Sequence, residues 1–354
     1  MRFGFQMGHR FLASLGVLAV VIAVVSLAPV PVAGQAPTPA AKTKTWTPPR
    51  TPWGQPDLQG TWSNATITPL ERPSTLGGKE VLTDEEAAKF AQEQNRRQNR
   101  DFVDPKKGGA GYPPASEGGV VPYNEFWYDR GNKVIGTKRT SLIVDPPNGR
   151  MPPLTPEAQA SAAARRAARA ERGPADSWAD RNLWERCITR GLPDGMLPGP
   201  YNNNVRLLQT PGYVVILTEM IHDARFVPLD GRPQLAQDIR QWMGASRGRW
   251  EGNTLVVETT NFSDKANFRG SGGNLHLVER FTRVDADTIN YQFTVDDPTT
   301  FTRPWTVAIP LAKTQEQIYE YACHEGNHAM VGVLAGARAE EKAAEEAAKK
   351  GQKR

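Results

Sequence analysis

The sequence predicts a mainly β protein in which antiparallel strands form a meander that closes into a barrel, with two or three peripheral helices and long loops. From about residue 205 onward, apolar and polar residues alternate with a period of two, which is typical of strands with one buried face. The clearest run is residues 289–295, where Ile, Tyr, Phe and Val alternate with Asn, Gln and Thr. Turn residues separate the runs at 251–253, 285–287 and 296–298. Short strands joined in order favour closure, because a closed sheet leaves no exposed edge.

About eight strands follow from this pattern, and we expect the last one at residues 317–323. Another strand is expected around Trp62. We predict a single barrel-like domain at residues 57–338, followed by a charged tail at 339–354 in which Ala alternates with Glu, Lys and Arg as in a solvated helix. Residues 63–200 are rich in loops and helices, and they either wrap the barrel or form a domain of their own.

Two helices are predicted within this loop-rich segment. Thr83 and Glu86 form a capping box that begins a helix over residues 82–100. Thr155, followed by Pro and Glu, begins a second helix that continues to about residue 172. Its many Ala and Arg residues indicate a solvated surface helix.

The first 36 residues have the pattern of a cleavable signal peptide. A basic start with Arg2 and Arg10 precedes the apolar residues 11–27, and small residues lead to a cleavage site after Ala36. The alternative is an uncleaved membrane anchor, since about 17 apolar residues nearly span a bilayer. We predict a Sec-exported, periplasmic or secreted protein with no stable membrane insertion after cleavage. Residues 37–56, rich in Pro, Thr and Lys, are expected to form a disordered leader.

The charge composition of the chain argues against some classes of binding partner. The chain has 43 Lys and Arg residues against 38 Asp and Glu residues, a formal net charge of +5, and both signs are interspersed along it. Nucleic acid is therefore not an expected partner, because binding it needs a one-sided basic patch. No glycine-rich loop stands between a strand and a helix, so no nucleotide cofactor is predicted. The sequence does not fix the oligomeric state.

The two cysteines of the chain, Cys187 and Cys323, are expected to form a disulfide, since paired cysteines are the rule in exported proteins. Two free buried thiols are the alternative. A disulfide would place residues 187–191 beside His324 and Glu325.

Candidate catalytic residues lie together at the end of one predicted strand. By alternation, Glu219 shares a face with Tyr213, Val215 and Leu217, so its carboxylate is expected to point toward the apolar interior, which is costly unless it is paired or functional. His222 follows as a candidate acid or base and Asp223 as the group that orients it; Glu219 is the second carboxylate. The competing interpretation is a structural salt bridge between Glu219 and an Arg of a neighbouring strand.

Further groups are expected to contact a small organic substrate at the barrel mouth. The predicted substrate-binding residues are Tyr201, Asn203, Arg225, His324 and Glu325. With these groups, the protein is expected to bind a small molecule and to transform it by acid–base chemistry without a cofactor, as a lyase, isomerase or hydrolase. A non-catalytic envelope binding protein is the alternative.

A second alternative is a metal-dependent hydrolase. Residues 324–328 match H-E-x-x-H, in which a helix places two imidazoles on one face to bind zinc. Here His324, Glu325 and His328 follow a predicted strand, and Gly-Asn between them signals a turn. No metal is therefore predicted, and a metal site at His324 and His328 remains open only as this alternative.

Several phrases of the sequence resemble a large family of secreted bacterial proteins of unknown function. These phrases are TPWG at 51–54, PDLQG at 56–60, RTSLIVDPP at 139–147, EMIHDAR at 219–225, SRGRWEGNTLVVETTNF at 246–262, residues 280–289 and YEYACHEGN at 319–327. The resemblance implies export but no particular activity. The segment GTW at 60–62 and the meander also resemble a lipocalin-like barrel, an analogy of fold that does not imply a function.

Overall fold

The computed structural model describes residues 46–109, 114, 123–173 and 175–351. Apart from Trp46, these residues belong to one compact unit, Thr47–Arg354. The predicted signal peptide lies outside the described residues. Among the described residues, no helix is both long and apolar enough to cross a membrane.

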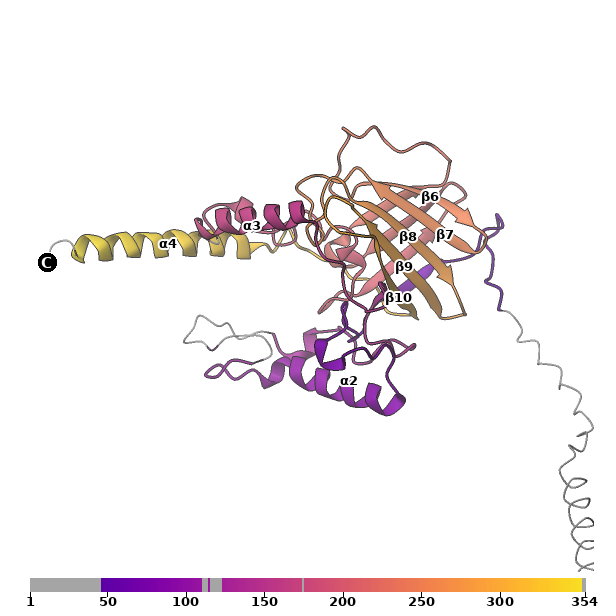
Figure 1. The fold of residues 1–354 in the computed structure, drawn as a ribbon, viewed down its shortest axis with the longest axis horizontal. Helices are drawn as coiled ribbons and strands as arrows, with labels where there is room; N and C mark the ends of the chain where they lie inside the picture. Colours follow the sequence, from indigo (N-terminus) through magenta and orange to yellow (C-terminus); the bar gives the residue numbers. More distant parts are fainter. Residues whose placement is uncertain (1–45, 110–113, 115–122, 174, 352–354) are drawn as a thin grey trace, which may run out of the picture. The chain divides into compact units, whose positions relative to one another are not determined.

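An antiparallel sheet of ten strands dominates the unit, and strands β6 to β10 lie side by side in Figure 1. The hydrogen-bonded order is β5-β4-β3-β1-β10-β9-β8-β7-β6, and β2 pairs with β10 off this path. The strands are β1 (Gly60–Ser63), β2 (Ile143–Asp145), β3 (Asn204–Gln209), β4 (Tyr213–Thr218), β5 (Ala224–Pro228), β6 (Ala245–Glu251), β7 (Thr254–Thr260), β8 (His276–Arg283), β9 (Thr288–Asp296) and β10 (Trp305–Thr314).

The predicted antiparallel meander is confirmed, but its closure into a barrel is wrong. The two edge strands, β5 and β6, are not hydrogen-bonded to each other. They nevertheless pack together, since a Cβ added to Gly248 of β6 would lie 2.8 Å from the Val227 side chain of β5. The sheet is thus strongly curled and its edges meet through side chains.

The interior of the curled sheet is filled. The predicted inward face of β9 is confirmed, with Ile289, Tyr291, Phe293 and Val295 all buried. The rings of Tyr291 and Phe293 contact each other and form a continuous aromatic core with Phe281 and Trp305. These packed rings occupy the part of the interior where a lipocalin-like barrel would hold its ligand.

The predicted strand at residues 317–323 is wrong. Strand β10 ends at Thr314, and residues 315–322 are extended but unpaired with any strand. The reason is that β10 already has strand partners on both sides, β9 on one and β1 and β2 on the other. The chain beyond it is held instead by side chains, as described below.

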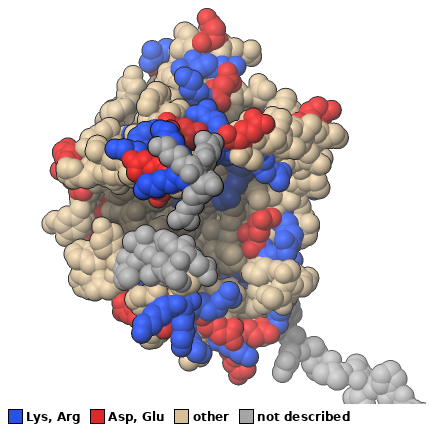
Figure 2. All heavy atoms as spheres, turned by 90° about the vertical axis from the view of Figure 1, so that its left-hand side faces the viewer, with Lys and Arg blue, Asp and Glu red and all other residues tan. Residues whose placement is uncertain are grey.

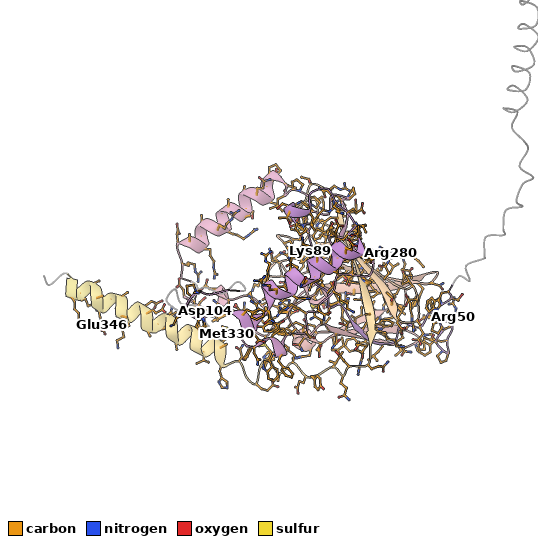
Figure 3. The ribbon with its side chains drawn as sticks, turned by 90° about the horizontal axis from the view of Figure 1, so that it is seen from below. Arg50, Lys89, Asp104, Arg280, Met330 and Glu346 are labelled. Carbon is orange, nitrogen blue, oxygen red and sulfur yellow. A yellow bond between two sulfur atoms is a disulfide. The ribbon has the colours of Figure 1, made fainter. Side chains whose placement is uncertain are left out.

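Three α-helices accompany the sheet: α2 (Asp84–Gln98), α3 (Pro156–Ala170) and α4 (His328–Gly351). The capping box of Thr83 and Glu86 is confirmed, and α3, capped by Thr155, buries no residue, as expected of a surface helix. Helix α4 includes the predicted charged tail but begins earlier, at His328; Met330 lies in its first turn and Glu346 in its second half (Figure 3).

Short 3₁₀ helices occupy the connections: η1 (Ser74–Leu76), η2 (Arg100–Phe102), η4 (Glu125–Trp127), η5 (Trp178–Asp180), η6 (Asp194–Met196) and η7 (Met220–His222). The part of the predicted leader that the structure describes has a defined conformation. Residues 49–57 form a turn closed by backbone hydrogen bonds from Thr51 to Gln55 and from Asp57 to Pro49. The Gln209 side chain anchors this turn to the sheet by donating to the Pro56 carbonyl.

Candidate functional site

The predicted catalytic residues lie where β4 turns into β5 through the 3₁₀ helix η7. Ile221 and His222 both have positive φ angles, 62° and 47°. A β-branched residue in this region is strained by about 1–3 kcal/mol and is held there only by its surroundings. The tight turn sends the side chains of Glu219, His222 and Asp223 into three different environments.

Glu219 is buried, as predicted, but for a different reason. The buried face of β4 carries Val214, Ile216 and Thr218, so the face expected for Glu219 is the outer one. Glu219 lies beyond the end of the strand with helical backbone angles and is 3 % exposed. The Glu219 carboxylate accepts from the backbone N–H groups of Asn204, at 3.2 Å, and Tyr319, at 3.3 Å. The Arg salt bridge considered for it is not formed.

The His222 imidazole is exposed, and its Nδ1 lies 2.9 Å from the carbonyl oxygen of Tyr321. Because a carbonyl only accepts, Nδ1 is the donor in this hydrogen bond. Asp223 was expected to orient this ring. Its carboxylate instead accepts from the Thr189 hydroxyl at 2.8 Å and the Arg190 amide at 3.1 Å. The orienting partner of His222 is therefore a backbone carbonyl.

Arg225, predicted to contact substrate, lies in the core instead. Its guanidinium makes a two-point ion pair with Glu279 of β8, one contact being 3.0 Å from Nη2 to Oε1. The Tyr291 hydroxyl donates to the same carboxylate at 2.9 Å, and burial together with Glu279 raises the pKa of Tyr291 well above its usual value. Since β5 and β8 are far apart in the sheet order, this network crosses the interior of the curled sheet.

The predicted disulfide Cys187–Cys323 is confirmed, and it is consistent with an extracytoplasmic protein. The Asn327 side chain reinforces the link by donating to the Glu185 carbonyl at 3.0 Å. Residues 187–191 therefore lie beside the segment that precedes α4, as expected.

The residues of the H-E-x-x-H match do not form a zinc-peptidase site. His324 and Glu325 lie in a turn, and His328 is the first residue of α4. All three side chains are exposed, and the described residues contain no group of three His, Cys, Asp or Glu side chains able to hold a metal ion. The substrate contacts predicted for His324 and Glu325 stay untested.

A cavity of about 1000 Å³ is lined by side chains from residues 178–194 and residues 262–275 and by Trp242; we call it the basic cavity. Five cationic side chains line it, but only one carboxyl group does. The cations are Arg181, Arg186, Arg190, Lys265 and Arg269.

Two of these cations are stacked on tryptophans. The Arg186 guanidinium lies 4.4 Å from the Trp178 ring, and that of Arg190 lies 4.3 Å from the Trp184 ring. Stacking fixes the plane of a guanidinium while its N–H donors remain free at the edge. Among the described residues, no carboxylate forms an ion pair with Arg186 or Arg190, whereas Arg181 pairs with Glu185 at 2.5 Å.

Two further groups complete the basic cavity. The Ser271 hydroxyl is a buried cavity-lining group, 1 % exposed, that has no hydrogen-bond partner among the described residues. Burial raises the pKa of the Asp194 carboxyl above its ordinary value, although Arg190 and Arg269 act in the opposite direction. With five cationic side chains against this one carboxyl group among the described residues, the cavity is strongly positive.

A second cavity, of about 780 Å³, contains the predicted residues Tyr201 and Glu219; we call it the acidic cavity. Its carboxyl groups are Asp129, Glu219 and Glu316, and no Lys or Arg of the described residues lines it. Four aromatic side chains line it: Tyr123, Trp127, Tyr201 and Tyr319. Burial raises the pKa of the Asp129 carboxyl, against the lowering effect of hydrogen bonds from Asn203. Asn203 is 2 % exposed, and its side-chain N–H donates to the Asp129 carboxylate at 3.2 Å.

Tyr321 connects the linings of the two cavities. Its hydroxyl accepts a hydrogen bond from the Trp184 indole of the basic cavity at 3.3 Å, and it lies near enough to Tyr201 of the acidic cavity to affect the pKa of that residue. Burial is the main cause that raises the pKa of Tyr201, and Tyr321 adds to it.

The residues of the basic cavity are not among the predicted site residues. Arg186 and Arg190 flank Cys187 four residues apart, and Trp178 and Trp184 precede them, so an Arg and Trp cluster beside a predicted disulfide was the available signal. The loop at residues 262–275 gave no such signal. On the face that Figure 2 shows, Lys and Arg are interspersed with Asp and Glu, so the charge of the cavity is not evident from the general surface.

Comparisons with known proteins give no family for this chain. No protein-family model, no curated protein and no solved structure matched it. The resemblance to a family of secreted bacterial proteins stays a prediction, and function has to be argued from the cavities.

Proposed function

We propose that this protein is a periplasmic or secreted binding protein for a small organic anion with an aromatic or other flat apolar part. The main support is the basic cavity, which has a volume of about 1000 Å³. Four of its five cations, all except Arg181, have no ion-pair partner among the described residues. A cavity of this size accommodates a drug-sized molecule.

The charges of the lining select the sign of the ligand. Unpaired guanidinium groups gain charge-assisted hydrogen bonds when a carboxylate, sulfonate or phosphate enters, and the planar fork of Arg suits two-point contact with such groups. The unpartnered Ser271 hydroxyl supplies a further polar contact inside the cavity. Because Asp194 is the one carboxyl group in the lining, and burial favours its neutral form, little negative charge opposes the ligand.

The aromatic lining selects the shape of the ligand. Trp178, Trp184 and Trp242 bring three indoles to the cavity, and Phe262 and Phe268 add apolar surface. Flat apolar groups stack on such rings. Because unpaired cations and aromatic rings are the groups that hold a flat anion, binding is the function that this geometry supports best.

The test uses a matched pair of probes, naphthalene-2-sulfonate and its neutral sulfonamide, in isothermal titration calorimetry. We expect the sulfonate to bind at least about tenfold more tightly. Arg186→Gln and Arg190→Gln should each weaken it by about 10- to 100-fold, since a hydrogen bond to a charged group contributes about 1.5–3 kcal/mol. Arg280→Gln is the control, because Arg280 lies on β8, is paired with Glu251, and does not line the cavity (Figure 3).

Equal affinity for the two probes would overturn the proposal, as would sulfonate binding that survives both Arg substitutions. A further check is ionic strength. Added salt should weaken the sulfonate far more than the sulfonamide, because it screens the charges of the cavity.

A further inference from the structure

The acidic cavity has the opposite chemistry, and we propose that it is a second, separate binding site that takes an organic ammonium ion. Three carboxyl groups and four aromatic side chains line it, without any Lys or Arg of the described residues. This combination matches an aromatic cage, in which ring faces and negative charge surround a cation that has lost its water.

Glu219 is the observation that points to a cationic ligand. A side chain that is 3 % exposed and lines a cavity normally has its charge balanced by a neighbouring cation. Both oxygens of Glu219 accept from backbone N–H groups, and among the described residues no Lys, Arg or His forms an ion pair with it. The nearest Arg on the chain, Arg225, is instead committed to Glu279. A positive ligand group in the cavity would supply the missing charge.

The exposed aromatic side chains of the lining are the second observation. Tyr123, Trp127 and Tyr319 are 76 %, 64 % and 70 % exposed. Large rings exposed to this degree, gathered around one cavity, indicate a surface that a ligand covers. Asn204 and Glu219, 5 % and 3 % exposed, belong to the same lining. A cation in this cavity can therefore meet exposed rings as well as a buried carboxylate.

Size and charge together favour a quaternary or alkylated ammonium over a metal ion. A volume of about 780 Å³ is far larger than a metal ion needs, and the described residues contain no metal-binding group of three carboxyl, imidazole or thiol side chains. A tetraalkylammonium group is large and weakly hydrated, so it gains from ring faces as well as from charge.

The test compares choline with 3,3-dimethylbutan-1-ol, which has the same shape without the charge, by calorimetry on the whole chain. We expect choline to bind at least about tenfold more tightly than the alcohol. Glu219→Gln, Glu316→Gln and Trp127→Ala should each weaken choline by about fivefold or more. Glu346→Gln on α4 (Figure 3) is the control, since this carboxyl group is exposed and does not belong to the cavity lining.

Glu219→Gln replaces one acceptor oxygen by a donor and can disturb the backbone at Asn204 or Tyr319. Glu316→Gln and Trp127→Ala change partly exposed side chains, so they keep the test valid if the Glu219 variant fails to fold. Similar binding of choline and the alcohol, or no binding of choline up to about 50 mM, would overturn the proposal. So would choline binding that none of these variants changes.

The result does not depend on the proposed anion site. Trp127→Ala and Glu316→Gln should leave naphthalene-2-sulfonate binding unchanged, and Arg186→Gln should leave choline binding unchanged. Failure of one site is thereby distinguished from failure of the other.

Discussion

The buried network of Arg225, Glu279 and Tyr291 allows a sharp prediction about stability. Glu279→Gln removes the negative charge but keeps the size of the side chain. Arg225 then stays charged, because a guanidinium does not release its proton in proteins. Glu279 is 0 % and Arg225 6 % exposed, so water cannot replace the lost partner.

The magnitude follows from this burial. Breaking a buried pair by removing one partner costs about 3–5 kcal/mol, which is a large part of the 5–15 kcal/mol by which most proteins are stable. Tyr291→Phe removes one hydrogen bond to a charged group, and it should cost about 1.5–3 kcal/mol. Replacing Arg225 and Glu279 together by Met should restore most of the loss, since no buried charge remains.

The assay is urea unfolding followed by tryptophan fluorescence with the disulfide intact. Arg249→Gln is the matched control, because Arg249 makes exposed pairs with Glu251 and Glu258 on the outer surface and should lose no more than about 1 kcal/mol. The reasoning is refuted if Glu279→Gln loses less than about 1 kcal/mol, or if the double Met variant is as unstable as the single one. Faster hydrogen exchange in β5 of Glu279→Gln would show that the network ties this edge strand to the interior.

Three further predictions concern the disulfide, the packed edges of the sheet and the basic cavity. Replacing Cys187 and Cys323 by Ser should lower the free energy of unfolding by about 5 kcal/mol, the chain-entropy value for a loop of 136 residues, and equal urea midpoints for variant and parent would contradict this. Gly248→Ala should cost about 1–3 kcal/mol by urea unfolding, because its Cβ would lie 2.7 Å from Leu229, whereas Gly212→Ala, with open space around it, should be nearly neutral; equal effects would argue against edge packing. Burial raises the pKa of the Asp194 carboxyl in the folded protein above its value of about 3.9 in the unfolded chain. The contribution of Asp194 to the free energy of unfolding is therefore fully present below the unfolded pKa and is lost as the pH rises through the folded pKa. Over the same range the newly charged carboxylate should weaken naphthalene-2-sulfonate binding, and Asp194→Asn should flatten both pH profiles; profiles that stay as steep would rule out this group as the cause.

The sequence was a good guide wherever local pattern decides structure. The alternation at residues 289–295, the capping box at Thr83 and the pairing of Cys187 with Cys323 all have a local or compositional cause, and all are confirmed. Barrel closure failed because pattern within strands says nothing of whether the two edge strands pair. In the curled sheet, the edge strand β6 is covered at Gly248 by the side chains of Val227 and Leu229, without hydrogen bonds between the two edge strands.

The candidate site was harder to predict because its residues come from loops. Alternation placed Glu219 on a strand face, but the strand ends one residue earlier, and the turn at Ile221 and His222 directs the neighbouring side chains apart. Arg225 was predicted to contact substrate, yet it pairs with Glu279, which lies 54 residues further along the chain. Ion pairs between distant strands depend on how the sheet curls, and a short stretch of sequence does not predict this curvature.

Two of the residues predicted to be catalytic, Glu219 and His222, help to hold residues 319–323 in the structure. This segment has no strand partner, so its backbone must be fixed by other groups. Glu219 accepts from the Tyr319 amide, His222 donates to the Tyr321 carbonyl, and Cys323 is covalently bound to Cys187.

Three anchors within five residues fix the backbone on both sides of Tyr321. The Tyr321 hydroxyl accepts from the indole of Trp184, which lines the basic cavity, and Tyr319 lines the acidic cavity. The positive φ angles of Ile221 and His222 belong to the turn that brings the imidazole to the Tyr321 carbonyl while Glu219 stays buried. The anchors therefore hold a segment without a strand partner in a position where it supports residues of both cavity linings.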